Sequence, residues 1–350
     1  MRVVITGATG NLGTSLLAAL EDEEQVDEVV ALARRQPRDA LGAEFVAADI
    51  TKDDLVPIFR GADAVVHLAW LIQPGRDESV TRLVNVTASK RVFDAAVAAG
   101  VRALVYASSV GAYSAGPKDR LVDESWPTHG TPSSFYARHK AITERQLDRL
   151  EQEHPGVRVV RLRPALVFKR EAGTEIRRLF IGPLLPRSLV RVGLIPVVPD
   201  IARLRFQAVH SLDVGDAFRR ALLSDARGAF NLAAEPVLDP EQLADVLHAR
   251  PIKLPPSVLR AGAALTFALR LQPTEPGWVD MAFAVPLMDS ARARTELGWS
   301  PRYSSTEALT ELLDGIRTAS QLETPPLARG TSGPARIREL LTGIGGKQGL

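Results

Sequence analysis

The sequence contains no cysteine, which excludes disulfide bonds and thiolate chemistry. This absence fits a reducing compartment, and we expect a cytoplasmic protein. Long hydrophobic runs are also missing. The longest uncharged apolar run, Ala261 to Leu269, is far shorter than the ~20 residues that a membrane-spanning helix needs. Because the N-terminus enters an apolar strand at once, we expect neither a signal peptide nor a membrane partner.

A marked excess of one charge is missing as well. The formal net charge is +2, and Lys and Arg are scattered along the chain. An electrostatic footprint for nucleic acid needs basic residues gathered on one stripe, so we expect no nucleic-acid partner. We also predict no metal site.

What the chain does have is an ordinary globular composition. Its 350 residues are 45% hydrophobic and 24% charged, which is enough for one large or two modest domains. The first half alternates short apolar strands with helical segments, the pattern of an α/β fold with a doubly wound parallel sheet of the Rossmann type. The expected strands are residues 2–6, 28–33, 45–48, 63–69 and 101–107.

The first expected strand leads into a glycine-rich loop and then into an apolar helix from Leu12 to about Leu20. A strand, a loop with three glycines and a helix in that order is the context of a dinucleotide-binding loop. Gly7 allows the tight turn, Gly10 lets the backbone approach a pyrophosphate, and Gly13 lets the helix pack against the strand. The N–H groups of the first helical turn then face the diphosphate. The predicted cofactor-binding residues here are Gly7, Thr9, Gly10, Asn11, Leu12 and Gly13.

Arg34 and Arg35 follow the second strand, where enzymes of this kind distinguish NAD from NADP. An acidic residue about 20 positions beyond the glycines bonds the ribose 2′-hydroxyl of NAD, whereas a nearby Arg accommodates a 2′-phosphate. Here the acidic position holds Ala33. Since a guanidinium group suits a phosphate, we predict that NADP(H) is preferred, with NAD(H) as the alternative. The structural alternative is that both arginines are only a charged strand end.

Tyr136 and Lys140 lie four residues apart in a segment predicted to be helical to about Glu153, so they share one helix face. An unperturbed tyrosine titrates near ~10, which leaves roughly 0.1% phenolate at neutral pH. An ammonium ~4 Å away is worth about 4 kcal/mol at an effective dielectric of ~20, or roughly three pKa units. We therefore predict a lowered pKa for Tyr136. Ser109, at the end of the fifth strand, is placed to bond the same substrate oxygen.

These motifs together resemble the extended short-chain dehydrogenases/reductases, the NAD(P)-dependent epimerase/dehydratase family, over residues 1 to about 315. The resemblance implies that Tyr136 is the acid/base, that Lys140 lowers its pKa and bonds the nicotinamide ribose, and that Ser109 orients the reacting oxygen. It also implies hydride transfer to or from the nicotinamide C4, and it suggests a homodimer. The further cofactor contacts that it implies are Asp49 and Ile50 at the adenine, Leu68 and Ala69 at the nicotinamide ribose, and Pro164 in the turn after the sixth strand.

Several residues depart from the family's pattern. Val110 and Gly111 stand where dehydratases carry an acidic pair, so 4,6-dehydration is not expected. Leu166 and Lys169-Arg170 replace the Asn and the Gly-Pro of many sugar-nucleotide enzymes. These replacements weaken the case for a contact to a nucleotide-sugar diphosphate.

Two residues are candidate substrate contacts in addition to Ser109. Trp70 stands at a position that is usually small in the family and favours a flat or apolar substrate, although packing alone would also explain a Trp. Arg205 is a candidate phosphate contact, with a solvated strand-edge charge as its alternative.

The predicted domains are an NAD(P)-binding Rossmann domain, residues 1–167, whose sheet is completed by about 205–234; a mostly substrate-binding lobe, 168–318; and a flexible tail, 319–350. The predicted function is NAD(P)-dependent oxidation or reduction of a secondary alcohol or ketone in a small-molecule substrate. Two alternatives stay open. One is a nucleotide-sugar epimerase that uses the same three residues and retains its cofactor, and the other is a non-catalytic NADP(H)-sensing regulator.

Overall fold

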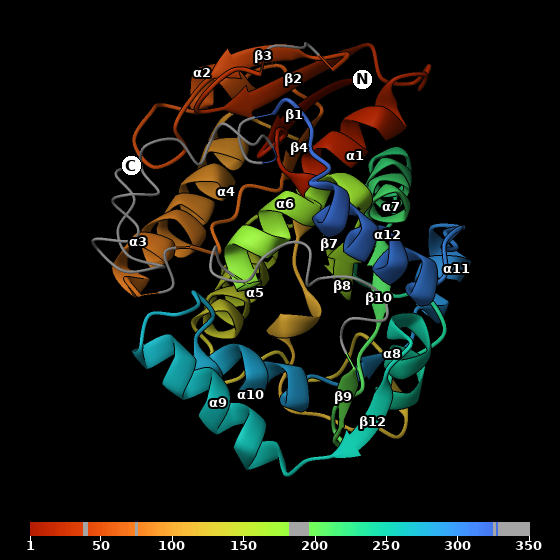
Figure 1. Ribbon diagram of the computed structural model, residues 1–350. Coiled ribbons are helices and arrows are strands. Elements are labelled where there is room, and N and C mark those ends of the chain that lie inside the picture. Colours follow the sequence, from red (N-terminus) through yellow and green to blue (C-terminus); the bar gives the residue numbers. More distant parts are fainter. Residues whose placement is uncertain (38–40, 74–75, 182–195, 325–326, 328–350) are drawn as a thin grey trace.

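A seven-stranded parallel sheet forms the centre of the protein, in the strand order β11-β7-β5-β4-β1-β2-β3 (Figure 1). The structure is a computed structural model that describes residues 1–37, 41–73, 76–181, 196–324 and 327. The α/β fold with a Rossmann-type sheet is therefore confirmed. The strands of this sheet are β1 Arg2–Thr6, β2 Glu28–Ala33, β3 Glu44–Ala47, β4 Ala64–His67, β5 Ala103–Ala107, β7 Arg158–Pro164 and β11 Gly228–Leu232.

Helices cover both faces of the sheet, as its apolar central strands require. One hydrophobic core lies between the sheet and the helices α1 (Asn11–Leu20) and α7 (Ser211–Leu223). The other core lies under α2 (Val56–Phe59), α4 (Ser89–Ala98) and α5 (Phe135–Glu153). Strand order reverses around β1 and β4, so the carboxyl ends of these strands are where a ligand is expected.

A second lobe is built from the later segments, with α9 and α10 lying together beyond one end of the sheet (Figure 1). Three two-stranded parallel sheets, β10-β8, β12-β9 and β13-β6, contribute to it. The remaining strands are β6 Leu121–Val122, β8 Leu166–Phe168, β9 Val197–Asp200, β10 Ala208–His210, β12 Arg250–Lys253 and β13 Leu287–Met288. The remaining α-helices are α3 Glu78–Arg82, α6 Gly173–Ile176, α8 Pro240–Leu247, α9 Pro256–Ala268, α10 Pro276–Ala284, α11 Ala291–Glu296 and α12 Ser305–Thr318.

The structure differs from the expected elements at several places. The strands expected at 45–48, 63–69 and 101–107 are β3, β4 and β5, with slightly different bounds. The helix α2 begins only at Val56, because Asp49 and Asp54 accept backbone N–H bonds from Thr51 and Val56 and so hold the preceding turn open. Pro164 is the last residue of β7 and pairs in register with Leu232, so it does not lie in a turn after that strand. Within 205–234, β11 joins the main sheet, whereas β10 pairs with β8.

The stretch predicted as a flexible tail is described as far as Thr324 and again at Leu327. The side chains of Ala319, Thr324 and Leu327 are buried. The possible helical turn at residues 336–341 lies outside the described residues. In the described ranges, no helix combines the length and the apolar character needed to cross a bilayer.

Candidate active site

In the glycine loop between β1 and α1, two of the three glycines lie tightly against neighbouring backbone atoms. Gly7 has φ +74°, and a Cβ there would come within 2.6 Å of the Ala69 backbone nitrogen. A Cβ on Gly13 would lie 2.4 Å from the Ala8 carbonyl. At Gly10 the nearest atom is the Gly7 carbonyl oxygen, at 3.5 Å. Close packing therefore accounts for Gly7 and Gly13, while the surface at Gly10 is open to a ligand.

The first turn of α1 fits a diphosphate group. Gly10 is the N-cap residue and provides no side-chain cap for the turn. The Oδ1 atom of Asn11 is buried and has no partner among the described residues. Lys169 places its ammonium beneath the turn, donating to the Asn11 carbonyl (3.1 Å) and the Thr14 hydroxyl (2.7 Å). Uncapped amides and a nearby positive charge are the features that an anion needs. The other two predicted loop residues lie beside this turn: Thr9 is buried, and Leu12 is partly buried against the core.

Arg34, Arg35, Asp49 and Ile50 are gathered at the carboxyl ends of β2 and β3. Both arginines are exposed, whereas Ile50 is buried. Burial raises the pKa of Asp49, but hydrogen bonds from Thr51 and the charge of Arg34 outweigh burial, so its net pKa lies below the usual value. The charge of Arg34 is therefore close enough to Asp49, the predicted adenine contact, to help lower its pKa.

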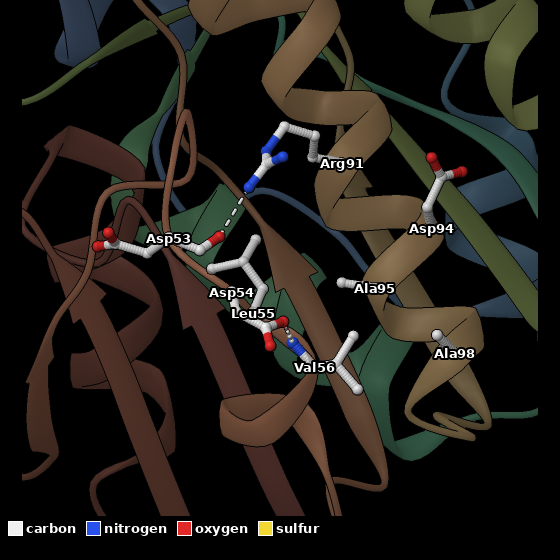
Figure 2. Close-up of a pocket in the computed structure, with 8 residues that line it drawn as sticks. All are labelled: Asp53, Asp54, Leu55, Val56, Arg91, Asp94, Ala95 and Ala98. Atoms are coloured by element: carbon white, nitrogen blue, oxygen red, sulfur yellow. Dashed lines mark hydrogen bonds between the residues drawn. The ribbon is translucent and has the colours of Figure 1, made fainter.

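A surface pocket of about 280 Å³ lies near this edge, between the turn before α2 and the helix α4. Figure 2 shows Arg91 reaching from α4 to this turn, where it donates to the Asp53 carbonyl (2.7 Å); it also donates to the Ile50 carbonyl (3.2 Å). None of the predicted site residues lines the pocket. Its contribution is structural, because Arg91 fixes the backbone that carries Asp49 and Ile50.

Tyr136 and Ser109 are brought together where β5 ends and α5 begins. The Ser109 hydroxyl accepts the Gly111 N–H at 3.0 Å, and it lies close enough to Tyr136 to act on the pKa of its phenol. A Cβ on Gly111 would lie 2.9 Å from Cε1 of the Tyr136 ring, so this position admits no side chain. Burial raises the pKa of Tyr136 to about 12, with the Ser109 hydrogen bond acting in the opposite direction.

Lys140 is buried under Trp70. Its Nζ atom donates to the Ala107 carbonyl at 2.7 Å and lies 3.5 Å from the centroid of the Trp70 ring, but 5.8 Å from that of Tyr136. Burial lowers the pKa of Lys140 well below its usual value. The predicted lowering of the Tyr136 pKa by Lys140 is therefore wrong, because burial of the phenol dominates and Ser109, rather than Lys140, is the group that acts to lower this pKa.

A buried carboxylate, Glu144, follows Lys140 by one helical turn and was not predicted. It accepts hydrogen bonds from the Ser108 hydroxyl (2.5 Å), from Arg161 (3.0 Å) and twice from Arg163 (2.9 Å each). Burial alone would raise its pKa, but both arginines and Ser108 hold the pKa at about 2. Its charge also acts to raise the pKa of Lys140. Through its bond to Ser108, which precedes Ser109, Glu144 holds α5 against the end of β5. In the sequence, the four-residue spacing from Lys140 was the one feature that could have indicated Glu144.

The remaining predicted residues fall into two groups. Leu68 and Ala69 lie at the end of β4 against the glycine loop, where the Leu68 N–H donates to the Thr6 carbonyl at 3.0 Å. Pro164 is buried at the end of β7. Arg205 belongs to the second lobe, where it donates to the Lys118 carbonyl at 2.8 Å, and its Nε is buried without a described partner. The structure therefore brings the residues predicted for the cofactor and for catalysis together at one edge of the sheet and, in the part of the chain that it describes, shows no contact between them and Arg205.

A parallel sheet with an open glycine at a helix start, and a Ser–Tyr–Lys group at the neighbouring strand ends, defines a Rossmann-type dinucleotide-dependent enzyme. The model of the NAD dependent epimerase/dehydratase family matches residues 3–233, and the chain belongs to this family. It is accordingly an enzyme of the short-chain dehydrogenase/reductase type.

Relatives and solved structures extend this similarity over most of the chain. Rv0501, an uncharacterized protein of Mycobacterium tuberculosis, is 27% identical over 326 residues, covering 89% of this chain and 83% of the relative. A 3 beta-hydroxysteroid dehydrogenase/Delta 5→4-isomerase of the same species is 27% identical over 341 residues, covering 89% of both chains.

Among solved structures, gox2253 matches with a TM-score of 0.69 at 22% identity, covering 92% of this chain and 99% of that chain. The UDP-glucose 4-epimerase of Thermus thermophilus in complex with NAD matches with a TM-score of 0.65 at 22% identity, covering 91% of this chain and 100% of that chain. At such identities the structures show a shared fold.

Proposed function

We propose that the protein transfers hydride between a nicotinamide dinucleotide and a secondary alcohol or ketone, with Tyr136 exchanging the proton. The observation that carries this proposal is the meeting of Ser109 and Tyr136 at the end of β5, with Lys140 one turn further along α5. The same edge of the sheet holds the glycine loop. The relative named as a hydroxysteroid dehydrogenase supports redox at a secondary alcohol.

Ser109, Tyr136 and Lys140 would have separate roles in the reaction. When bound, a nicotinamide dinucleotide supplies or accepts the hydride. Ser109 orients the substrate oxygen, and Tyr136 moves a proton at its Oη atom. Lys140 supports the site with a positive charge. Since the pKa of Tyr136 is about 12, the phenol is protonated at neutral pH and is ready to act as an acid.

NADP(H) is the cofactor that we propose on the basis of Arg34 and Arg35. Both guanidinium groups are exposed at the end of β2, and the position that would be acidic in an NAD site is Ala33. An exposed pair of forked donors is suited to a 2′-phosphate and gains little from a neutral hydroxyl. NAD is the cofactor of several solved neighbours, so NAD(H) is the alternative.

A nucleotide-sugar epimerase is the second candidate, and the UDP-glucose 4-epimerases among the solved neighbours favour it. The same Ser–Tyr–Lys group would serve, with the cofactor retained through the cycle. Leu166 and Lys169-Arg170 argue against it, because they replace the Asn and the Gly-Pro of many sugar-nucleotide enzymes.

A panel of alcohols, ketones and nucleotide sugars distinguishes the two. The purified protein is incubated with NADPH, NADP⁺, NADH or NAD⁺, nicotinamide absorbance is followed, and products are separated to detect conversion without net redox. We expect net oxidation of NADPH with a ketone. Conversion of UDP-glucose with no net change in absorbance would replace the proposal with the epimerase, and the absence of both reactions would reject it.

A further inference from the structure

We propose that aromatic side chains around Tyr136 bind a flat, uncharged, ring-bearing part of the substrate. These side chains are Trp70, Phe135, Tyr136, Phe180 and Trp278, called here the aromatic cluster. The inference rests on the proposed function, because it names the class of alcohol or ketone that the same site accepts.

Two tryptophan rings of the aromatic cluster contact the Tyr136 ring. The Trp70 ring lies 5.8 Å from the Tyr136 ring in an edge-to-face arrangement of 76°, and the Trp278 ring lies 4.9 Å away at 37°. Phe180 meets Trp278 edge-on at 4.9 Å, and Phe135 does so at 6.5 Å. These separations are those at which aromatic rings attract one another, so a further flat ring would be held by the same forces.

The aromatic cluster differs from core packing in its exposure. Trp70, Tyr136, Phe180 and Trp278 are only partly buried, whereas Phe135 is fully buried. In addition, the Trp70 Nε1–H is buried without a described partner. Tyr136, the predicted proton donor, and three large rings of the aromatic cluster therefore retain accessible surface that is available to a ligand.

Hydrogen bonds hold the separate segments of the aromatic cluster in place. Beyond Trp70, the Asn85 side chain exchanges two bonds of 2.7 Å with the backbone of Leu71. Gln73 then donates to the Leu179 carbonyl at 3.0 Å, next to Phe180. The Thr274 hydroxyl donates to the Phe180 carbonyl at 2.7 Å. Three segments distant in sequence are thus fixed against each other, as a preorganised binding site requires.

The cations near α10 are used to anchor that helix. Lys118 donates to the carbonyls of Arg205 (2.7 Å) and Ala282 (2.8 Å). Arg203 donates to the Phe283 carbonyl at 3.0 Å. These bonds hold the end of the helix that carries Trp278, and they engage groups that a nucleotide diphosphate would need. These two cations are therefore committed to backbone carbonyl groups, as an uncharged substrate part would permit.

The surroundings of the aromatic cluster are apolar as well. Beside Tyr136, a Cβ on Gly111 would lie 3.1 Å from Sδ of Met281, which is buried. The adjoining helix α9 has no buried residue, and Leu265 and Leu269 at its end are 60% and 59% exposed. Apolar rings would gain from burial here, while the Trp70 Nε1–H is the donor of the aromatic cluster that remains for a polar substituent.

The test compares 2-acetylnaphthalene, 2-dodecanone of the same carbon number, and UDP-glucose. KM is measured with NADPH, and binding is measured separately by calorimetry in the presence of NADP⁺. We expect KM for 2-acetylnaphthalene to be about tenfold lower than for 2-dodecanone, which is what one or two aromatic contacts supply. Trp278→Ala should remove this preference, and Trp278→Phe should restore part of it. Trp126→Ala, which truncates a partly buried tryptophan outside the aromatic cluster, should leave the preference unchanged.

The outcomes separate this inference from the proposed function. Reduction of both ketones with equal KM would overturn the inference while the hydride transfer stands. Binding of 2-acetylnaphthalene that depends on Trp278 without turnover would support the inference and reject the proposed reaction. Tighter binding of UDP-glucose than of either ketone, or no binding of 2-acetylnaphthalene, would overturn the inference. Equal losses in Trp278→Ala and Trp126→Ala would do the same.

Discussion

The ammonium group of Lys140 lies over the indole ring of Trp70, 3.5 Å from its centroid, and the edge of the same indole meets Tyr136. Trp70 thus contacts both members of the Tyr–Lys pair. A cation over the face of a tryptophan is stabilised by the ring quadrupole, most strongly when water is excluded. The residue that separates this chain from the small-residue pattern of its family is therefore part of the candidate active site.

Replacing Tyr136 with Phe removes the proton donor and keeps the ring. General acid–base catalysis contributes roughly 10²–10⁴-fold, so we expect kcat to fall by at least about a hundredfold. The dissociation constant for NADP⁺, measured by calorimetry, should stay within about twofold, because the first turn of α1 and Arg34 are untouched. Tyr303→Phe, at a ring stacked on His210, serves as the control and should keep full activity. Unchanged kcat in Tyr136→Phe would remove this residue from the mechanism.

The sequence predicted those parts of the fold and site that depend on local signals. The bounds of β1 and β2 agree with the predicted strands, and the helix that carries Tyr136 begins one residue earlier than expected. A strand's apolar pattern and a glycine loop each lie within a short stretch of sequence, so they can be recognised without the tertiary structure. His67 lies inside one of these predicted strands, and it is buried between Thr6 and Ser89 with hydrogen bonds to both.

Features that depend on tertiary contacts could not be predicted in the same way. Trp278 reaches Tyr136 from α10, and no local pattern links the two residues. The pKa of Tyr136 is raised by burial, which is a property of the whole fold, whereas the i, i+4 spacing of Lys140 shows only that the two share a helix face. The role of the Glu144 carboxylate required the positions of Arg161 and Arg163 on β7, a separate element.

Replacing Arg34 and Arg35 together with Ala tests the cofactor preference. A guanidinium group that bonds the 2′-phosphate stabilises NADP alone, since NAD has only a hydroxyl there. We expect the dissociation constant for NADPH to rise by about tenfold or more, which corresponds to about 1.4 kcal/mol, with little change for NADH. Binding is measured by NAD(P)H fluorescence. Lys90→Ala, at an exposed site on α4, is the matched removal of a positive charge. Equal losses for both cofactors would contradict the NADP assignment.

Gly10→Ala and Gly13→Ala should separate cofactor binding from stability. At Gly13 the added methyl group would lie 2.4 Å from the Ala8 backbone, so we expect a lower melting temperature. At Gly10 the nearest described atom is 3.5 Å away, an ordinary contact, so the fold should tolerate alanine. The methyl group would then obstruct only a diphosphate that approaches the loop. For Gly10→Ala we expect an unchanged melting temperature with at least about tenfold weaker binding of NADP⁺. Full affinity in Gly10→Ala would argue against a diphosphate at this turn.

Replacing Glu144 with Gln tests the buried ion network behind Ser109. The variant keeps the size of the side chain but leaves two buried arginines without their shared carboxylate, and breaking such a pair costs about 3–5 kcal/mol. Because the folded-state pKa of Glu144 is about 2, below its usual value of 4.5, its stabilisation is present above about pH 4.5 and is lost as the pH falls toward 2. Urea unfolding should therefore show a large deficit for Glu144→Gln at pH 7 and a clearly smaller one near pH 3.

The matched control for Glu144→Gln is Asp94→Asn. Asp94 pairs with Lys90 at 2.7 Å, but both side chains are 60% exposed, and exposed pairs contribute little to the free energy of unfolding. We expect Asp94→Asn to unfold like the wild type at both pH values. A deficit in Glu144→Gln that persisted unchanged at pH 3 would mean that packing, rather than the carboxylate charge, accounts for the loss. Side-chain packing alone would then hold α5 against β5, and the Glu144 charge would not act to raise the pKa of Lys140.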